Sequence, residues 1–245
     1  MKSILIIGAN SAIAKATARR YAEQQNCLYL LARDPEQLAV QKADLVLRGA
    51  SSVDYAKFDA TNFSDHEALV AKALKTLGHF DIVLISHGSL PDQALCERNF
   101  DAALEAFNVN ALSVISLLNY IVKPMQERRK GCIAVVTSVA GDRGRQSNFI
   151  YGAAKAMVST YLQGLRGRLF PHNVAIVDIK PGFVDSPMTA HLPKGALWAQ
   201  PDQIAQRIVR AVEKKRTTIY TPGFWRLIMI IVCSVPEFIF KRLKL

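Results

Sequence analysis

Three side chains near the middle of the chain, Ser138, Tyr151 and Lys155, have the types and spacing needed to move a proton to or from a carbonyl oxygen. Tyr151 and Lys155 lie four residues apart in a helix-forming run, so they share one helix face, with Cβ atoms roughly 5–6 Å apart. A phenol titrates at about 10 in water, and an ammonium group one turn away favours the phenolate, which lets a tyrosine exchange a proton near neutral pH. Ser138 can supply a second hydrogen bond to the same oxygen.

The predicted elements around these residues indicate how they are positioned. Residues 133–137 form an apolar, β-branched run that is typical of a buried parallel strand, so Ser138 directly follows a strand end. A tyrosine and a lysine at this spacing also occur by chance, and the pair taken alone is weak evidence. A strand-end serine thirteen residues before the tyrosine makes coincidence a poorer explanation.

The composition is that of a single α/β domain. The chain has 245 residues, half of them hydrophobic, and strand-like and helix-like segments alternate without a linker or repeat. The four cysteines are scattered, and no C-x-x-C pair or histidine cluster accompanies them, so we predict neither a metal site nor a disulfide framework. Because the chain starts directly in an apolar strand rather than a secretory leader, we expect a cytoplasmic location.

The charge is strongly positive and unevenly distributed. The net charge is +11, and residues 205–245 contain nine basic side chains against two glutamates. Such an excess can attract nucleic acid, anionic lipid or a phosphorylated substrate. No zinc finger, basic zipper or RNA-binding aromatic motif accompanies it, so we exclude nucleic acid as a partner.

The first strand and the turn after it are typical of a nucleotide-binding site. Residues 3–7 predict a short strand, and the small-residue turn Gly8-Ala-Asn-Ser-Ala-Ile-Ala14 leads into a helix through Tyr21. Such a turn lets backbone N–H groups approach a pyrophosphate, whose charge the helix dipole favours. Only Gly8 is a glycine, with Ala12 and Ala14 at the other two expected positions, so an ordinary tight turn is the alternative.

The end of the second predicted strand, residues 28–31, bears on the choice of cofactor. Ala32 is neutral where a carboxylate would bind the 2′-hydroxyl of NAD, and Arg33 can pair with the 2′-phosphate of NADP. We therefore predict NADPH in preference to NADH. The alternative is that Arg33 is simply solvated and Asp34 caps the next helix.

Two further strand ends carry candidate residues. The predicted strand 52–58 ends at Asp59 and Ala60, where a carboxylate can accept a hydrogen bond from an adenine amino group or merely cap a loop. The predicted strand 80–85 ends at Ser86, His87 and Gly88. His87 has no partner visible in the sequence, so we expect it to pack in the cofactor loop rather than act as an acid or base.

The remaining elements continue the alternation. We predict helices over 64–77, 100–129, 149–170 and 201–214, and strands over 174–179 and 217–220. The helix 100–129 is expected to distort at Pro124, and it contains Asn110, a polar residue that needs a hydrogen-bond partner. Pro181 and Gly182 predict a turn under the cofactor, and Ser186 is placed to bond the nicotinamide amide. Residues 187–200 are predicted to form a substrate lid.

In order and spacing these residues resemble the short-chain dehydrogenase/reductase family over roughly residues 3–221. The resemblance rests on the turn from Gly8 to Ala14, Asp59, Asn110, Ser138, Tyr151-x-x-x-Lys155 and Pro181-Gly182. It implies a doubly wound, seven-stranded parallel sheet, the Rossmann fold, with Tyr151 as proton donor and Ser138 positioning the substrate oxygen. Lys155 would lower the tyrosine pKa and hold the nicotinamide ribose, and Asn110 would support a water that relays protons to Lys155.

The resemblance also extends the set of residues expected to contact the cofactor. These are Gly8, Asn10, Ser11, Ala12, Ile13, Arg33, Asp59, Ala60, Ser86, His87, Gly88, Tyr151, Lys155, Pro181, Gly182, Val184 and Ser186. The chain departs from the family in two places: Ser86-His87-Gly88 stands for Asn-Ala-Gly, and alanines replace two of the three early glycines. Both departures concern cofactor contacts rather than the proton relay.

Residues 139–149, 188–192, 224–226 and 236–242 are similar to the bacterial subgroup that reduces the keto sugar of decaprenylphosphoryl-2-keto-pentofuranose. That similarity implies a lipid-linked sugar ketone as substrate. We divide the chain into a reductase domain, residues 1–223, and a C-terminal extension, residues 224–245.

The extension contains a nine-residue run, 227–235, that is apolar except for Ser234 and is stopped by Pro236. A spanning helix needs about 20 residues, so this run is too short to cross a bilayer. With aromatic and basic residues on either side, it suits a position in a membrane interface, at the inner face of the cell membrane. A buried C-terminal segment or a subunit contact in a homo-oligomer, which we also expect, is an equally good interpretation.

The main functional hypothesis is an NADPH-dependent ketone reductase. The alternative within the enzyme class is a general reductase of soluble carbonyls such as 3-oxoacyl thioesters. A protein that binds NADP without catalysis is the alternative from another class, because the departures described above weaken the nucleotide site.

Overall fold

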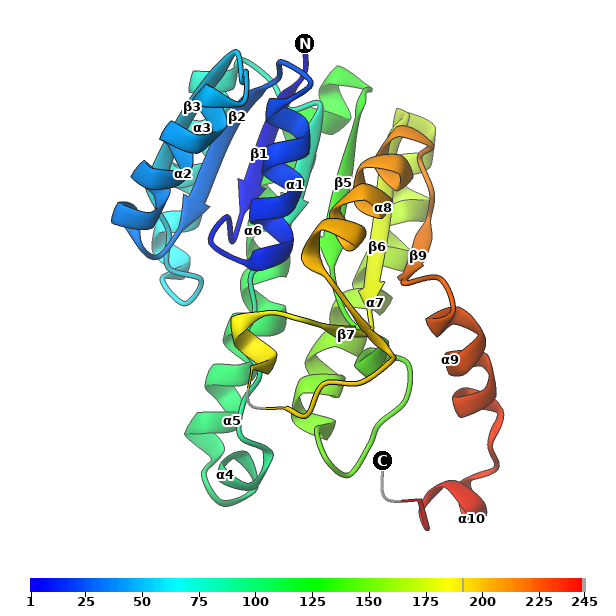
Figure 1. Ribbon diagram of the computed structural model, residues 1–245. Coiled ribbons are helices and arrows are strands. Elements are labelled where there is room, and N and C mark those ends of the chain that lie inside the picture. The colour runs from blue at the N-terminus through cyan, green and yellow to red at the C-terminus, as the bar shows by residue number, and fades with distance from the viewer. Residues whose placement is uncertain (191, 244–245) are drawn as a thin grey trace.

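The computed structural model describes residues 1–190 and 192–243, and a seven-stranded, entirely parallel sheet forms its centre (Figure 1). The strand order is β3-β2-β1-β4-β5-β6-β9. The strands are β1 (Ser3–Ile7), β2 (Cys27–Ala32), β3 (Ser52–Lys57), β4 (Ile82–Ile85), β5 (Gly131–Val136), β6 (Val174–Pro181) and β9 (Thr218–Thr221). The central strands are near-continuous apolar runs because helices cover both of their faces. The doubly wound Rossmann fold predicted from the sequence is confirmed.

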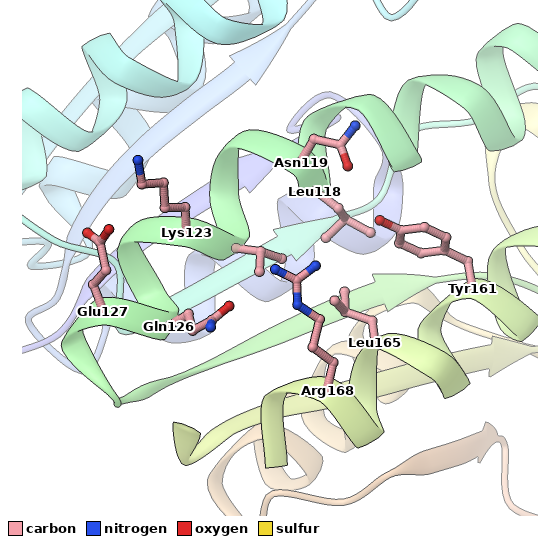
Figure 2. A pocket seen from close by; sticks show the side chains of 9 residues that line it. Leu118, Asn119, Lys123, Gln126, Glu127, Tyr161, Leu165 and Arg168 are labelled. Atoms are coloured by element: carbon pink, nitrogen blue, oxygen red, sulfur yellow. The ribbon is translucent and has the colours of Figure 1, made fainter. Parts of the chain in front are cut away.

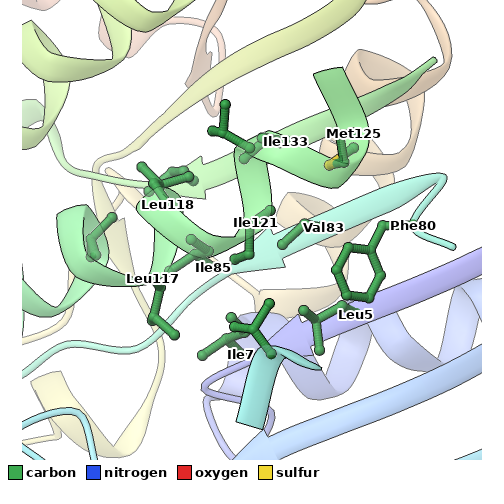
Figure 3. Close-up of a cluster of buried hydrophobic side chains, with 14 of the residues drawn as sticks. Leu5, Ile7, Phe80, Val83, Ile85, Leu117, Leu118, Ile121, Met125 and Ile133 are labelled. Atoms are coloured by element: carbon green, nitrogen blue, oxygen red, sulfur yellow. The ribbon is translucent and has the colours of Figure 1, made fainter. Parts of the chain in front are cut away.

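Helices on the two faces of the sheet bury separate hydrophobic cores. The helices are α1 (Ala12–Ala22), α2 (Pro35–Leu47), α3 (His66–Leu77), α4 (Gln93–Arg98), α5 (Phe100–Phe107), α6 (Ser113–Arg128), α7 (Phe149–Leu169) and α8 (Pro201–Glu213). One face packs against α3, α6 and α7, through the cluster that Figure 3 shows around Leu5, Ile85, Leu117 and Ile121. The other face packs against α1, α2 and α8.

The strand order reverses direction next to β1. Strand β1 pairs with β2 on one side and with β4 on the other. The connections that leave the carboxyl ends of β1 and β4 therefore diverge, and such a switch point is where open parallel sheets bind ligands. Two of the segments predicted to contact a nucleotide, the turn from Gly8 to Ala14 and Ser86-His87-Gly88, follow these two strands.

One helix differs from its prediction. The expected helix 100–129 is interrupted by a π-helical turn at Asn108–Leu112, whereas Pro124 lies within α6 without ending it. The prediction of a distortion at Pro124 is therefore wrong in its position. A physical reason for the π turn is that Asn110 donates a side-chain hydrogen bond to the carbonyl of Ala106, within the same helical stretch. The short helix α4 before it was not predicted.

This continuous helical stretch, Phe100–Arg128, is long and apolar enough to span a membrane by length and composition. Its side chains from Ala111 to Met125 nevertheless supply much of the core on one face of the sheet. Its apolar character is therefore explained by packing within the domain.

The segment after β6 crosses the carboxyl end of the sheet (Figure 1). It contains the short strands β7 (Phe183–Val184) and β8 (Trp198–Ala199), which pair with each other, and a 3₁₀ turn at Pro187–Thr189. This is the segment predicted to act as a lid. His191 within it, and Lys244 and Leu245 at the end of the extension, lie outside the described residues.

The C-terminal extension forms two short helices, α9 (Trp225–Ser234) and α10 (Glu237–Phe240), beyond strand β9 (Figure 1). Trp225 and Met229 of α9 are buried against Val139, which directly follows Ser138. The extension is thus in contact with the loop that carries the candidate catalytic serine.

Candidate active site

Ser138 lies where β5 ends, in extended backbone that caps the 3₁₀ turn Val139–Gly141. Its hydroxyl accepts a hydrogen bond from the backbone N–H of Ala140 at 3.1 Å. The Ser138 side chain lies close enough to Tyr151 to act to lower the pKa of the phenol. The strand end and helix α7 therefore bring these two hydroxyl groups together, as predicted from the spacing.

Lys155 lies one turn after Tyr151 on α7 and is 3% exposed. Its Nζ atom is 5.6 Å from the centroid of the Tyr151 ring. Among the described residues, the ammonium group donates only one side-chain hydrogen bond, to the carbonyl of Val136 at 3.5 Å. A buried ammonium has three donors, so this one is poorly satisfied by the protein alone.

The pKa values of this pair contradict the expected phenolate. Burial raises the pKa of Tyr151 to about 12, although the Ser138 hydrogen bond opposes the shift. Burial also lowers the pKa of Lys155 to about 8, although Asp178 opposes that shift. Burial, which disfavours the charged form of each group, is the largest cause of both pKa shifts. The tyrosine is therefore a neutral phenol near pH 7, which is the form that can donate a proton.

Asn110 is fully buried in the π turn and fixes the loop that follows β4. Its Oδ1 accepts from the backbone N–H of Ser89 at 3.1 Å, and its Nδ2 donates to the Ser89 hydroxyl at 3.2 Å. A Cβ atom added to Gly88 would lie 2.8 Å from Asn110 Oδ1 and 3.3 Å from Lys155 Nζ. Asn110 Oδ1 and Lys155 Nζ therefore both lie next to Gly88.

The turn after β1 is shaped by close backbone contact with the loop after β4. Gly8 has a φ of +78°, and a Cβ atom there would lie 2.4 Å from the backbone nitrogen of His87. Ser11 caps helix α1, and its hydroxyl lies 2.9 Å from that of Ser86. Glycine is therefore needed at position 8 for two reasons, its positive φ and its contact with the backbone of His87.

The other predicted residues of this turn, Asn10, Ala12 and Ile13, lie at the N-terminus of helix α1. Asn10 forms two hydrogen bonds with α2 and the residue that caps it. It donates to the carbonyl of Asp34 at 3.3 Å and accepts from the side chain of Gln41 at 2.5 Å. Ala12 and Ile13 form the first turn of α1. The backbone N–H groups at this helix end are available to an anion such as a pyrophosphate.

Arg33 is exposed at the end of β2, beside the turn that contains Asp59. Asp59 accepts hydrogen bonds from the backbone N–H and the hydroxyl of Thr61, both at 2.9 Å, and these bonds together with the charge of Arg33 lower its pKa. Asp34 caps α2 through Glu36 and Gln37, as the alternative interpretation expected. The adjacent Ala60 is buried.

His87 is half-buried and packs against Ser113 and Phe58. Its Nε2 donates to Ser113 Oγ at 2.8 Å, because that hydroxyl donates in turn to the carbonyl of Val109. Its ring lies edge-on to Phe58, with centroids 5.5 Å apart. Burial and the charge of Lys155 lower its pKa to about 3, so the imidazole is neutral. This arrangement agrees with the packing role.

The turn after β6 is covered by the C-terminal extension. A Cβ atom added to Gly182 would lie 1.9 Å from Nε1 of Trp225, so glycine is needed beside the indole. Pro181 ends β6, Val184 is buried, and Ser186 lies 3.2 Å from the Thr189 hydroxyl. Sequence reasoning did not identify Trp225 as part of this wall, although it did single out the Phe224-Trp-Arg run.

A buried polar cluster behind Ser138 was also missed. Thr137, directly before the serine, donates to Asp178 at 2.5 Å, and Asp178 lies 3.7 Å from Lys180 Nζ. Lys180 forms an ion pair with Asp142, which also accepts from the Tyr220 hydroxyl at 2.9 Å. The cluster links both sides of the Ser138 loop to β6 and β9, and so fixes the position of the loop.

A groove of about 360 Å³ lies elsewhere, on the outer side of α6 and α7 (Figure 2). It is lined by Leu118, Asn119, Val122, Lys123, Gln126, Glu127, Tyr161, Leu165 and Arg168. None of the predicted site residues lines it. We therefore do not assign the groove to the active site.

The seven-stranded parallel sheet agrees with comparisons to known proteins. A family model described as short chain dehydrogenase matches residues 2–196. The chain belongs to the short chain dehydrogenase family. It is 32% identical to an uncharacterized oxidoreductase of Streptomyces coelicolor over 245 residues, covering 99% of this chain and 96% of the relative.

Two further similarities of this short chain dehydrogenase were found. It is 30% identical to an uncharacterized oxidoreductase of Mycobacterium tuberculosis over 240 residues, covering 98% of this chain and 96% of the relative. Its fold is similar to the crystal structure of a single-substitution variant of actinorhodin polyketide ketoreductase with NADPH, with a TM-score of 0.82, 20% identity, and coverage of 91% of this chain and 97% of that one. The protein is therefore an oxidoreductase acting on CH–OH or C=O groups.

The site of this dehydrogenase fits a nicotinamide dinucleotide. Gly8 lets the turn after β1 pack closely against the loop after β4, and this turn leads into the N-terminus of α1, where backbone N–H groups can bind a pyrophosphate. The buried Lys155 ammonium lacks acceptors that a ribose hydroxyl would provide. These observations on the pyrophosphate side and the nicotinamide side are independent of each other.

Proposed function

We propose that this short chain dehydrogenase is an NADPH-dependent reductase that converts a ketone to a secondary alcohol. The observation that carries the proposal is the neutral Tyr151 hydroxyl beside Ser138, with Lys155 one turn below. A neutral phenol donates a proton, and reduction of a carbonyl requires one at the oxygen.

Each residue of the site has a distinct task in this proposal. Ser138 donates a hydrogen bond that orients the substrate oxygen toward Tyr151, which supplies the proton. Lys155 binds the nicotinamide ribose with the N–H groups that the protein leaves without acceptors. Asn110 holds the loop beside Lys155 and supports the path by which the proton on Tyr151 is restored. The bound cofactor supplies the hydride.

The preference for NADPH is supported by residues at the end of β2. Arg33 is exposed there. The preceding residue, Ala32, is neutral, so position 32 carries no negative charge that would repel a 2′-phosphate. The similar polyketide ketoreductase was solved with NADPH. An Arg33 side chain facing a 2′-phosphate would form charge-assisted hydrogen bonds of the kind that discriminate NADPH from NADH.

For the substrate we propose a lipid-linked sugar ketone, handled at the inner face of the cell membrane. The support is the similarity of residues 139–149 and 224–226 to reductases of polyprenyl-phosphate-linked keto sugars, together with the apolar extension beside the Ser138 loop. A long-chain substrate would meet an apolar surface close to the site.

A second candidate substrate is a 3-oxoacyl thioester or another soluble ketone. The observation that favours it is the similar fold of a polyketide ketoreductase. A third candidate function, binding of NADP without catalysis, is opposed by the complete set of Ser138, Tyr151 and Lys155.

A substrate panel tests these proposals. NADPH oxidation is followed with a polyprenyl-phosphoryl keto sugar, a 3-oxoacyl thioester and a simple cyclic ketone, and each is repeated with NADH. Turnover of the keto sugar at the highest kcat/KM would support the lipid-linked substrate, whereas a preference for the thioester would replace it. Tight NADPH binding without turnover of any carbonyl would contradict the reductase itself.

A further inference from the structure

The C-terminal extension presents a cluster of exposed apolar side chains, which we call the tail surface. It comprises Leu227, Ile230 and Ile231 of α9 and Phe238 and Ile239 of α10, each at least 43% exposed. Leu227 and Ile231, four residues apart on α9, are 64% and 59% exposed. Single exposed apolar side chains need no explanation, but a cluster on two adjacent short helices indicates a binding surface.

The tail surface is held in a fixed orientation by the domain. On its inner side, Trp225 and Met229 are buried against Val139. Arg143, in the loop between Ser138 and Tyr151, donates to the carbonyls of Val232 and Val235, both at 2.6 Å. These contacts orient α9 with one face inward, so its outward face is not needed to complete the core.

Arg143 fixes α10 as well. Its guanidinium pairs with Glu237 at 3.0 Å and lies 3.6 Å from the centroid of the buried Phe240 ring. Both helices are therefore attached to the same loop. The exposed side chains of the tail surface lie on a preorganised platform next to the active site.

The charges around the tail surface distinguish between its possible occupants. Arg226, Lys241 and Arg242 are exposed beside it, and within the described residues none forms an ion pair. The nearby acidic residue Glu237 is already paired with Arg143. A second copy of this chain would bring like charges together. An anionic bilayer instead provides an apolar interior for the exposed side chains and negative headgroups for the basic residues.

The dimensions of α9 fit a helix that lies along a membrane rather than across it. Ten residues make a helix of about 15 Å, roughly half of the hydrocarbon thickness of a bilayer. An amphipathic segment of this kind inserts its apolar face to the level of the headgroups and acyl boundary.

We propose that the tail surface docks this protein on an anionic lipid bilayer, with α9 and α10 in the interface and Arg226, Lys241 and Arg242 on the headgroups. This inference rests on the extension alone and not on the proposed reaction. It brings the Ser138 loop close to the membrane, because Arg143 and Trp225 join the two.

Vesicle flotation of the full chain tests the proposal. We expect the protein to float with phosphatidylcholine vesicles that contain phosphatidylglycerol, and to bind pure phosphatidylcholine much more weakly. The triple variant R226Q/K241Q/R242Q should lose affinity for the anionic vesicles by about fivefold for each charge removed. Absence of flotation, or equal binding to both kinds of vesicle, would overturn the proposal.

A pair of double variants tests the apolar part. Leu227→Asp with Ile231→Asp should reduce binding to anionic vesicles by about tenfold or more, since two inserted side chains become charged. The matched control is Val40→Asp with Leu47→Asp on α2, where the side chains are 71% and 88% exposed. It adds the same two negative charges, so apart from the repulsion that these charges cause it should bind the vesicles as the wild type does. Equal losses in both variants would contradict the assignment.

Sedimentation velocity and thermal melting complete the test. If the wild type fails to float and the α9 variant alone dissociates an oligomer, the tail surface is a contact between copies and the membrane proposal is wrong. Melting curves that match the wild type establish that a loss of flotation does not come from unfolding. Because flotation requires no turnover, its result is independent of the substrate panel.

Discussion

The Nζ atom of the buried Lys155 lies 5.6 Å from the centroid of the half-buried Tyr151 ring. The pKa values of the two groups move toward the neutral form of each, to about 12 for Tyr151 and about 8 for Lys155. The protein without its ligands therefore holds a phenol that keeps its proton across the physiological pH range.

Tyr151→Phe should lower kcat/KM for ketone reduction by about 10²–10⁴-fold, because the variant cannot donate a proton to the substrate oxygen. NADPH oxidation measures the rate, and NADPH fluorescence measures cofactor binding, which should change little. The matched control is Tyr161→Phe on the same helix, at a tyrosine that lines the outer groove instead. Wild-type activity of Tyr151→Phe would rule out the assigned role.

Lys155→Met should stabilise the protein at pH 7 by about 1–3 kcal/mol, because it removes a buried cation. The folded lysine loses its proton near pH 8 and the unfolded one near 10.5, so the unfolded state binds more protons between these values. The free energy of unfolding of the wild type therefore increases as the pH rises. The difference in this free energy between the variant and the wild type should shrink between pH 8 and 10.5. Urea unfolding at several pH values measures it, and a constant difference would show that the charge is not responsible.

Arg33→Asp should raise the KM for NADPH by about tenfold to a hundredfold and improve the use of NADH, because the new carboxylate repels a 2′-phosphate and accepts from a 2′-hydroxyl. Steady-state kinetics with both cofactors measures the effect. Arg210→Asp, an equal charge change at an exposed position of α8, should leave the preference unchanged. If Arg33→Asp kept the wild-type preference for NADPH over NADH, Arg33 would not determine the choice of cofactor.

Gly8→Ala should destabilise the fold by about 1–3 kcal/mol and weaken cofactor binding, since the residue has a φ of +78° and its Cβ would meet the backbone of His87. Thermal melting and NADPH titration measure the two effects. Gly164→Ala, in α7 with no atom within 4 Å of the added Cβ, should instead be neutral or slightly stabilising. If both variants melted at the wild-type temperature, the close contact at Gly8 would be disproved.

The sheet and the relative placement of Ser138, Tyr151 and Lys155 could be predicted because local sequence determines them. The apolar runs that form β1, β4 and β5 have the length of buried strands, and Ser138 and Tyr151 follow from a strand end and a helix start. The π turn around Asn110 could not be predicted, because the pattern of apolar residues continues through it and the distortion arises from a side chain bonding within its own helix.

The remaining errors involve residues that are distant in the sequence. The pKa of Tyr151 was expected to fall because Lys155 is near, whereas burial, which depends on the whole fold, raises it. The contacts of Arg143 with Val232 and of Trp225 with Gly182 join parts of the chain that carry no shared local pattern. Tertiary packing determines these features, and only the structure reveals them.

The carbonyl groups that Arg143 binds belong to residues close to the C-terminal end of the chain. During synthesis they are added after the sheet strands up to β6 have become available to pair. A growing chain that has not reached Val235 would thus lack the partners that secure the loop between Ser138 and Tyr151. The loop therefore gains these contacts later than the sheet gains its strands up to β6.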